Sequence, residues 1–221
     1  MAVDELLLEQ AVDSGACALR WYRWDRPTIS LGHFQDPRHV AELPVMAALP
    51  IVRRLSGGGA IIHDCELTYS CGVPASHPLA QAPRELYTLV HEAIIGVLKP
   101  FGVAVQFRGE PDSSRASEFL CFGRGDSFDV VVGPHKVLGS AQRRRKGAIL
   151  QHGSLVIGRS TFAPQFPGIN DLSLRPVDPL ALVEGLAAAV GAVLSPEVRR
   201  GNLTSEERRI AENRAPVAVI R

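Results

Sequence analysis

The chain has 221 residues, which is enough for one sizeable domain or two very small ones. Hydrophobic residues make up 46% of it and charged residues 21%, so general disorder is excluded. The 24 Lys and Arg nearly cancel the 23 Asp and Glu, which leaves a net charge of +1. This balance gives no reason to expect binding to nucleic acid or to an anionic membrane.

No apolar run reaches the length that crosses a bilayer. The first ten residues carry acids where a secretory signal carries a basic region. We therefore expect a soluble, cytoplasmic protein. The four cysteines, at positions 17, 65, 71 and 121, fit neither a metal knuckle nor a dense disulfide framework. In a reducing cytoplasm they are expected to be free thiols, each by default a small buried side chain.

The first part of the chain begins with a helix and continues with strands. Residues 1–14 show helical spacing of apolar side chains, with acids near the start. Residues 18–24 and 28–31 are predicted strands, joined across a turn-forming group at 25–27. A short helical stretch is expected over 37–42.

Extended segments and one clear helix follow. Residues 51–55, 60–63 and 67–73 are predicted strands. Residues 83–99 show apolar side chains at helical spacing, and Pro100 ends that helix. Residues 103–107 are the next predicted strand, before a polar loop at 109–118.

The remaining elements are an antiparallel meander and two helices. The meander has predicted strands at 128–132, 136–142 and 148–157, connected by Gly133-Pro134 and by a basic turn at 143–147. Residues 179–194 form an Ala- and Leu-rich helix, and 204–213 a charged helix with a capping box. Strands dominate the middle and helices flank them without regular alternation. This order favours one α+β domain over 1–221, with a mixed, largely antiparallel sheet.

The densest motif of the first half is the run from Arg53 to His63, which contains Ser56 and three consecutive glycines. Glycines without Cβ atoms let a ligand approach the backbone N–H groups, and the two arginines and the histidine favour a ligand loop. A flexible hairpin turn is the other interpretation. The Lys-Ser or Lys-Thr of a phosphate loop is absent, and a strand follows where a dinucleotide fingerprint needs a helix.

The second dense region contains Cys121 and the segment from Lys136 to Ala141. Cys121 ends a polar loop just before the meander, where a thiol is a better nucleophile candidate than in a helix or an apolar strand. Lys136 is the nearest plausible cation to stabilise a thiolate. It could equally be an edge-strand lysine that keeps strands apart, and Cys121 an ordinary buried thiol.

Two further patterns carry less weight. The histidines are scattered, and His63-Asp64 lacks a second ligand at helical spacing, so we expect no metal site. The basic run at 143–146 is either a solvated turn or a place that steers an acidic partner protein.

Taken together, these segments resemble the lipoate–protein ligase and octanoyltransferase branch of the biotin/lipoate ligase superfamily. The matching pieces are Thr28-Ile29-Ser30-Leu31-Gly32-His33-Phe34-Gln35, the run 53–63, Glu66-Leu67-Thr68-Tyr69-Ser70, Lys136-Val137-Leu138-Gly139-Ser140-Ala141-Gln142 and Gln151-His152-Gly153-Ser154-Leu155. They occur in the family's order and cover residues 1–157. The tail at 196–221 has no assigned counterpart.

The resemblance implies an α+β catalytic domain with an acyl tunnel. The residues that it places at the acyl site are Arg53, Arg54, Ser56, Gly57, Gly58, Gly59, His63, Gly139, Ser140, Ala141 and His152. In one branch of octanoyltransferases a cysteine followed by phenylalanine precedes the Lys-x-x-Gly-Ser-Ala strand. Cys121-Phe122 lies at that place, 15 residues before Lys136.

This branch implies an acyltransferase with Cys121 as nucleophile and Lys136 stabilising the thiolate. Octanoyl-acyl-carrier protein is then the donor, and a lysine of a lipoyl domain or of the glycine cleavage H protein the acceptor. A thioester donor is already activated, so no cofactor is expected. The alternatives are a lipoate–protein ligase that uses ATP and Mg, and a non-catalytic binder of acyl groups or of a carrier protein. We expect a monomer.

Overall fold

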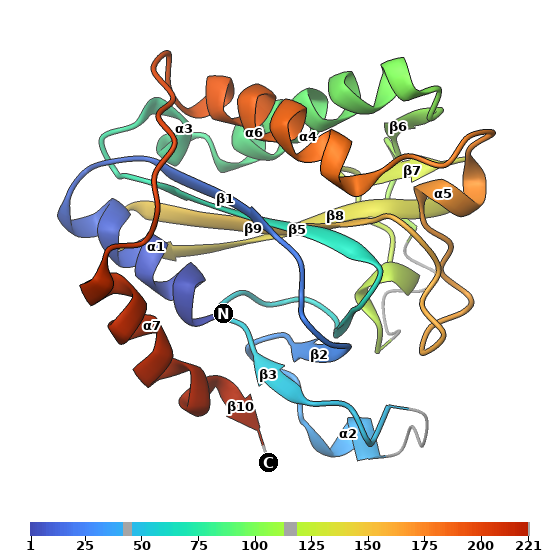
Figure 1. Ribbon diagram of the computed structural model, residues 1–221, viewed down its shortest axis with the longest axis horizontal. Helices are drawn as coiled ribbons and strands as arrows, with labels where there is room; N and C mark the ends of the chain where they lie inside the picture. The colour runs from blue at the N-terminus through green and yellow to red at the C-terminus, as the bar shows by residue number, and fades with distance from the viewer. Residues whose placement is uncertain (42–45, 113–118, 221) are drawn as a thin grey trace.

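The computed structural model describes residues 1–41, 46–112 and 119–220. Its larger sheet has six antiparallel strands in the order β1-β5-β9-β8-β7-β6. Their bounds are β1 Ala18–Tyr22, β5 Glu66–Val73, β6 Val105–Phe107, β7 Val130–Val132, β8 His135–Arg145 and β9 Ala148–Val156. The long central strands β5, β8 and β9 form the platform on which the rest of the chain packs (Figure 1).

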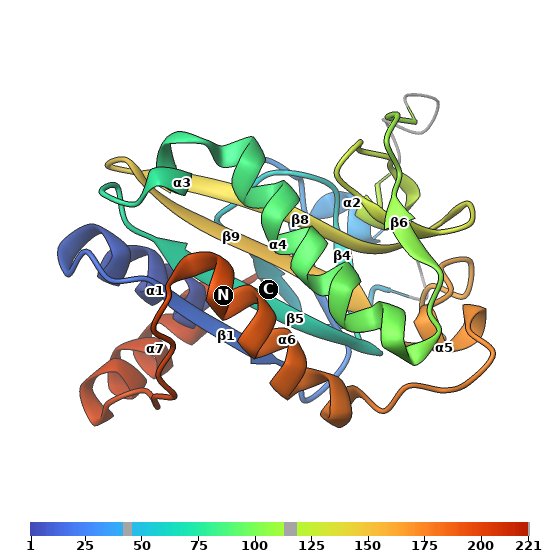
Figure 2. The same ribbon diagram turned by 90° about the horizontal axis from the view of Figure 1, so that it is seen from above.

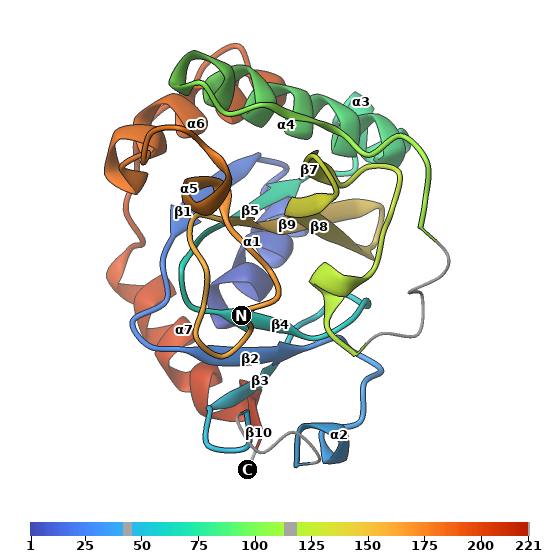
Figure 3. The ribbon, with the colours of Figure 1, turned by 90° about the vertical axis from the view of Figure 1, so that its right-hand side faces the viewer.

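A smaller, four-stranded sheet has the order β10-β3-β2-β4. Its strands are β2 Thr28–Leu31, β3 Ile51–Arg53, β4 Ile61–His63 and β10 Val219–Ile220. The β2–β3 pair is parallel and the other pairs are antiparallel. Figure 3 shows this sheet below the larger one, with the first helix and the connecting loops beside the space between them.

Helices cover both faces of the larger sheet (Figures 1 and 2). On one face lie α4 (Pro83–Leu98) and α6 (Pro179–Leu194), whose apolar side chains join the main core. On the other face lies α1 (Ala2–Asp13), against which α7 (Ser205–Ala218) packs. The shorter helices are α2 Arg38–Ala41, α3 Pro78–Gln81, α5 Ile169–Leu172 and the 3-10 turns η1 Lys99–Phe101 and η3 Cys121–Gly123.

Helix α4 forms where its sequence predicts it. Proline at the first helical position is pre-set for helix, and Leu86, Val90 and Ile94 recur on the face that is buried against the sheet. The helix tightens into η1 and stops at Gly102, which has a left-handed φ of 75°.

Most of the expected elements are confirmed within one or two residues. The meander of β7, β8 and β9, the helix at 179–194 and the capping box of the last helix are all present. In that box the Glu207 N–H donates to Thr204 Oγ1, and the Thr204 N–H donates to the Glu207 carboxylate. Residue 42 of the short helical stretch and 113–118 of the polar loop lie outside the described residues.

Two expectations are corrected. The strands fall into two sheets rather than one, because β1 pairs with β5 whereas β2 joins the smaller sheet. The basic turn is shorter than 143–147: β8 continues to Arg145, and Lys146 and Gly147, at φ 49° and 83°, make a two-residue hairpin turn. Arg145 forms ion pairs with Glu5 and Glu9 of α1, so it helps to hold that helix.

In the described part of the chain, no helix combines the length and the apolar character needed to cross a membrane.

We predict that Ile94→Ala lowers the free energy of unfolding by about 2–5 kcal/mol. Ile94 is fully buried between α4 and the larger sheet, and its truncation leaves a cavity there. Chemical denaturation measures the change. Glu92→Ala, on the exposed side of the same helix, is the control and should change the free energy by less than about 0.5 kcal/mol. Equal losses for the two variants would contradict this packing.

Candidate active site

The turn that carries Cys121 is fixed by backbone pairing with the glycine loop. The Cys121 N–H donates to the Ala60 carbonyl at 2.7 Å, and the Ala60 N–H donates to the Phe119 carbonyl at 2.8 Å. A Cβ on Gly59 would lie 2.9 Å from the Cys121 nitrogen. Glycine at position 59 is therefore what allows the two segments to come this close.

Lys136 lies beside the Cys121 thiol. Its Nζ is 3.8 Å from Sγ and 3.4 Å from the Cys121 carbonyl oxygen. The ammonium is also 2.9 Å from a carboxylate oxygen of Asp129, and the side chains of this ion pair are 4% and 5% exposed. An ammonium so close to a thiol stabilises the thiolate. The cation is thus where the sequence analysis places it.

Gly139 makes room for the lysine. A Cβ at that position would lie 2.8 Å from Lys136 Nζ and in contact with its Cε. The lysine side chain folds back along β8 through this space to reach Cys121. The glycine of the Lys-x-x-Gly-Ser-Ala segment therefore shapes the site through the lysine as well as through the cavity.

Cys121 opens onto a cavity between the two sheets whose empty space, about 510 Å³ in all, is continuous with solvent. Of the residues predicted for the acyl site, its walls include Arg54, Gly57, Gly58, His63, Gly139, Ser140, Ala141 and His152. A second cavity of about 410 Å³, lined mainly by apolar side chains such as Ile62, Leu120 and Phe166, adjoins the first at Ile61 and Phe122. A chain of methylene groups fits these surroundings better than a charged ligand does.

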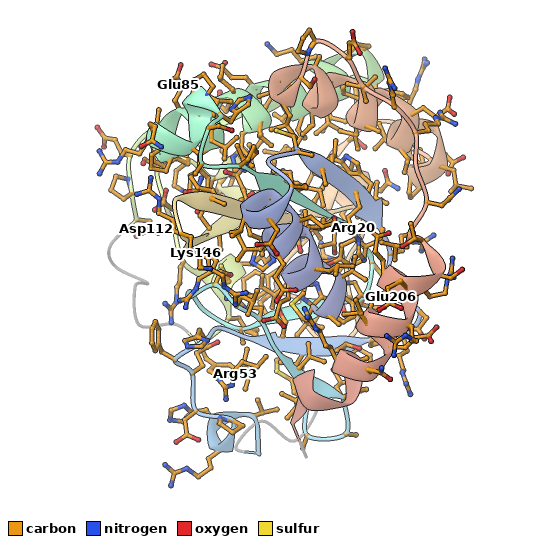
Figure 4. All side chains as sticks on the ribbon, turned by 90° about the vertical axis from the view of Figure 1, so that its left-hand side faces the viewer. Arg20, Arg53, Glu85, Asp112, Lys146 and Glu206 are labelled. Atoms are coloured by element: carbon orange, nitrogen blue, oxygen red, sulfur yellow. The ribbon has the colours of Figure 1, made fainter. Side chains whose placement is uncertain are left out.

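Four predicted residues lie beside the main cavity rather than in its wall. Ser56 bonds to His152, and Gly59 lies against the Cys121 turn. Lys136 lines a neighbouring polar cleft together with Arg108 and His135. Arg53 lines a different cleft, between α1, α7 and the smaller sheet. Figure 4 shows Arg53 beside that sheet, at the opposite end of the view from Glu85 of α4.

Arg53 and Arg54, the two arginines before the glycine loop, both donate hydrogen bonds to backbone carbonyls. Arg53 donates to the carbonyls of residues 32, 33 and 35. Arg54 donates to the carbonyls of Ser30, Gly57 and Gly59 at 2.9, 2.8 and 2.6 Å. Burial lowers the pKa of the Arg54 guanidinium to about 10, so it stays charged at neutral pH. The charge of the Arg54 guanidinium remains next to the cavity, although most of its N–H groups already donate to backbone carbonyls.

A buried histidine with a carboxylate and a hydroxyl partner stands on one side of the cavity. His63 Nδ1 bonds to Glu66, which also accepts from Thr68 and Ser154. The opposite ring nitrogen is 2.7 Å from Ser30 Oγ, and Trp24 stacks on the ring at 4.2 Å.

A second group of the same kind joins three distant segments. His152 Nδ1 is 3.1 Å from Asp4 of α1, and its Nε2 is 2.5 Å from Ser56 Oγ at the start of the glycine loop. Burial lowers the pKa of His152, whereas the bond to His152 and the nearby cations hold that of Asp4 low. Neutral His152 therefore donates to ionised Asp4 and accepts from Ser56.

A series of three hydrogen bonds, each with a defined donor, ends near Lys136. Tyr69 donates to Ser140 Oγ at 2.7 Å, Ser140 donates to His91 Nε2 at 2.7 Å, and His91 Nδ1 donates to the Phe128 carbonyl at 2.7 Å. Burial lowers the pKa of His91 to about 4, so the ring is neutral at pH 7. These hydrogen bonds thus fix the loop that leads into Asp129.

Among the cysteines, the surroundings distinguish Cys121. Burial raises the pKa of Cys71 to about 12 and also raises those of Cys17 and Cys65. Among the described residues, no group of three or more His, Cys, Asp and Glu side chains is arranged to hold a metal ion.

Sequence reasoning missed the carboxylates of this region, which are Asp4, Glu66 and Asp129. Asp4 and its histidine partner are 148 residues apart, so no local pattern links them. The sequence did hold a signal for Asp129. This residue lies just before the first strand of a hairpin and two residues from Val131, the cross-strand partner of Lys136, so the acid and the lysine are near neighbours.

Comparisons with known proteins find related sequences and related folds. The family model of the lipoyl protein ligase A/B catalytic domain matches residues 1–165. An octanoyltransferase LipM from Kyrpidia tusciae is 34% identical, and the match covers 96% of this chain and 88% of that protein. The corresponding enzyme from Moorella thermoacetica is 32% identical, with coverages of 99% and 90%.

Solved structures share the fold at lower identity. A lipoate-protein ligase A bound with ATP superimposes with a TM-score of 0.70 at 20% identity, covering 96% of this chain and 87% of that one. The bi-partite lipoate protein ligase from Thermoplasma acidophilum gives 0.69 at 20% identity, covering 96% and 85%.

We predict that Gly139→Ala lowers the rate at which iodoacetamide alkylates Cys121 at pH 7 by about tenfold. The added methyl group pushes Lys136 away from the thiol. Peptide mapping by mass spectrometry follows Cys121 apart from the other cysteines. Gly96→Ala is the control, because its Cβ enters open space on α4. An unchanged rate in a folded Gly139→Ala protein would show that the lysine is not held here by the missing Cβ.

We predict that His91 makes the protein less stable as pH falls from 6.5 to 4. The ordinary histidine pKa is 6.5 and that of His91 is about 4, so over this window the unfolded chain binds the extra proton. The loss approaches about 3 kcal/mol. Urea unfolding at several pH values should show a flatter dependence for His91→Gln than for the native chain. His135→Gln, at an exposed position, should keep the native slope.

Proposed function

Because the chain belongs to the lipoyl protein ligase A/B catalytic domain family, we propose that it is an octanoyltransferase of protein lipoylation that works through a thioester on Cys121. The observation that carries the proposal is Lys136 Nζ at 3.8 Å from the Cys121 thiol, at the wall of a cavity of about 510 Å³. A cysteine nucleophile needs an adjacent cation and a place for the acyl chain, and both are present.

The reaction has two transfers. The Cys121 thiolate attacks the carbonyl carbon of the donor thioester, a new carbon–sulfur bond forms, and the donor leaves as a thiolate that takes a proton from solvent. The neutral ε-amine of an acceptor lysine then attacks the acyl-Cys121 carbonyl. An amide forms, the bond to Sγ breaks, and the amine gives up one proton as Cys121 returns to its starting state.

The proposed donor is octanoyl-acyl-carrier protein, and the proposed acceptor is a lysine of a lipoyl-domain protein such as the glycine cleavage H protein. The acceptor class is supported by the related ligase from Thermoplasma acidophilum, whose structure was described together with its E2 lipoyl domain. The octanoyl chain lies, in this proposal, against Gly57, Gly58 and Ala141, where small residues leave room for methylene groups.

ATP is not required in the proposed reaction, because a thioester is already activated. A relative of the same fold binds ATP, so an adenylating ligase is the alternative to test. A polyphosphate at the glycine loop would draw on Arg53 and Arg54. Six of their hydrogen bonds go to backbone carbonyls, which favours the ATP-independent route.

We predict that incubation with octanoyl-acyl-carrier protein without ATP adds one octanoyl group to the native chain, seen in the intact-protein mass and removed by hydroxylamine. Cys121→Ala should carry none. Cys65→Ala is the matched control, because Cys65 lies in the adjoining cavity without a lysine partner in the described structure, and it should be acylated like the native chain.

The same samples separate the alternatives. If no adduct forms, but ATP and lipoate together modify a lipoyl domain equally well with the native chain and with Cys121→Ala, the protein is a ligase. Bound octanoate without a covalent adduct and without turnover would indicate a binding protein.

A further inference from the structure

Asp129 forms an ion pair with the lysine that lies beside the Cys121 thiol. One carboxylate oxygen lies 2.9 Å from Lys136 Nζ. The other accepts the backbone N–H of Asp126 at 2.8 Å, and Arg108 Nε lies 3.8 Å from it. The carboxylate is therefore tied to backbone on one oxygen and to the lysine on the other, which leaves it little freedom to turn.

We propose that Asp129 is a positioning residue that fixes the Lys136 ammonium beside Cys121, so that its charge stays next to the thiolate. This inference rests on the proposed role of Cys121 as nucleophile. It goes further by assigning the position of Lys136 to a carboxylate that does not line the substrate cavity.

Because Lys136 is buried, its ammonium group needs the Asp129 carboxylate as a partner. The Lys136 side chain is almost completely buried, and a buried ammonium without a partner gives up its proton or moves to solvent. Burial also raises the pKa of Asp129, whereas the charge of Lys136 opposes that rise. Each group thus favours the ionised form of the other.

The surrounding structure restricts the pair to one geometry. Gly139 leaves the space through which the lysine reaches the acid, since its missing Cβ would also lie 3.4 Å from the Asp129 carboxylate. The His91 ring holds the carbonyl of Phe128, the residue before Asp129. Helix α4, strand β8 and the loop before β7 therefore all set the position of one ammonium.

Other charges near the pair do not replace Asp129. Among the described residues, Lys136, Arg54 and Tyr87 interact electrostatically with Cys121, and the Arg124 guanidinium lies against the same turn, next to Gly59. Lys136 is also close to His91, which is neutral at pH 7. Asp126 lies near Asp129, but its side chain accepts the Phe128 N–H and makes no ion pair with the lysine.

The test measures the rate at which iodoacetamide alkylates Cys121 between pH 5 and 10, followed by peptide mapping. Asp129→Asn keeps the shape of the side chain and removes its charge. We expect the midpoint of the pH profile to move up by about one unit, with an alkylation rate at pH 7 about tenfold lower, because Lys136 loses its partner. A downward shift would overturn the proposal, since it would make Asp129 a group that weakens the field of the lysine.

Two further variants separate positioning from general effects. In a Lys136→Met background, Asp129→Asn should cause no further shift, because the carboxylate acts through the lysine. Asp126→Asn removes a charge from the same loop and should leave the profile at its native midpoint. Equal shifts with and without Lys136, or from either aspartate, would refute the proposal.

This experiment needs no acyl donor. Failure of the octanoyl adduct to form would therefore reject the proposed function and leave the coupling of Asp129, Lys136 and Cys121 to be decided by the alkylation profiles alone.

Discussion

The close approach of two backbone segments, 57–60 and 119–121, is the constraint on which the site depends. Cys121 belongs to a short turn, and its place is set by the bond from its N–H to the Ala60 carbonyl, next to the bond from the Ala60 N–H to the Phe119 carbonyl. That pairing needs Gly59, and the loop on its other side needs Gly32, where a Cβ would collide with the Gly58 carbonyl. The glycine loop therefore allows the close approach of the Cys121 turn as well as the approach of a ligand. Arg54, which donates to carbonyls on both sides of the loop, makes the same approach rigid.

Three buried histidines stabilise the interior because both ring nitrogens of each have a partner. His63 and His152 both lie between a carboxylate and a serine hydroxyl, and His91 lies between a hydroxyl and a carbonyl. An imidazole can satisfy two partners at once through its two ring nitrogens. These histidines therefore make part of the interior rigid. The charges near the acyl-compatible space are the Arg54 guanidinium in the cavity wall and the Lys136–Asp129 ion pair beside Cys121.

The elements and the central pair could be predicted because their information is local. Helical spacing identified a helix at 83–99, which the structure has at 83–98, and Gly133-Pro134 marked the first turn of the meander. Family-like motifs pointed to Cys121 and Lys136. What could not be predicted depends on distance along the chain: the sequence does not state that Asp4 meets His152, or that β1 and β2 belong to different sheets. The roles of the arginines were also out of reach, because only the structure shows that Arg53 is turned toward carbonyls of another loop, outside the main cavity.

The same fold can serve adenylation and thioester transfer, so the chemistry must be decided by a few side chains placed on it. A ligase activates a carboxylate and needs cations free to bind phosphates. A transferase receives an activated acyl group and needs one nucleophile whose charge is stabilised. In this chain the two motif arginines are bound to backbone, whereas the lysine is bound to an acid and to a thiol. A lysine held by Asp129 beside a thiol suits sulfur chemistry better than phosphate chemistry. In the proposed reaction, the group that decides between the two therefore comes from the short turn at 121–123 rather than from the sheets that support it.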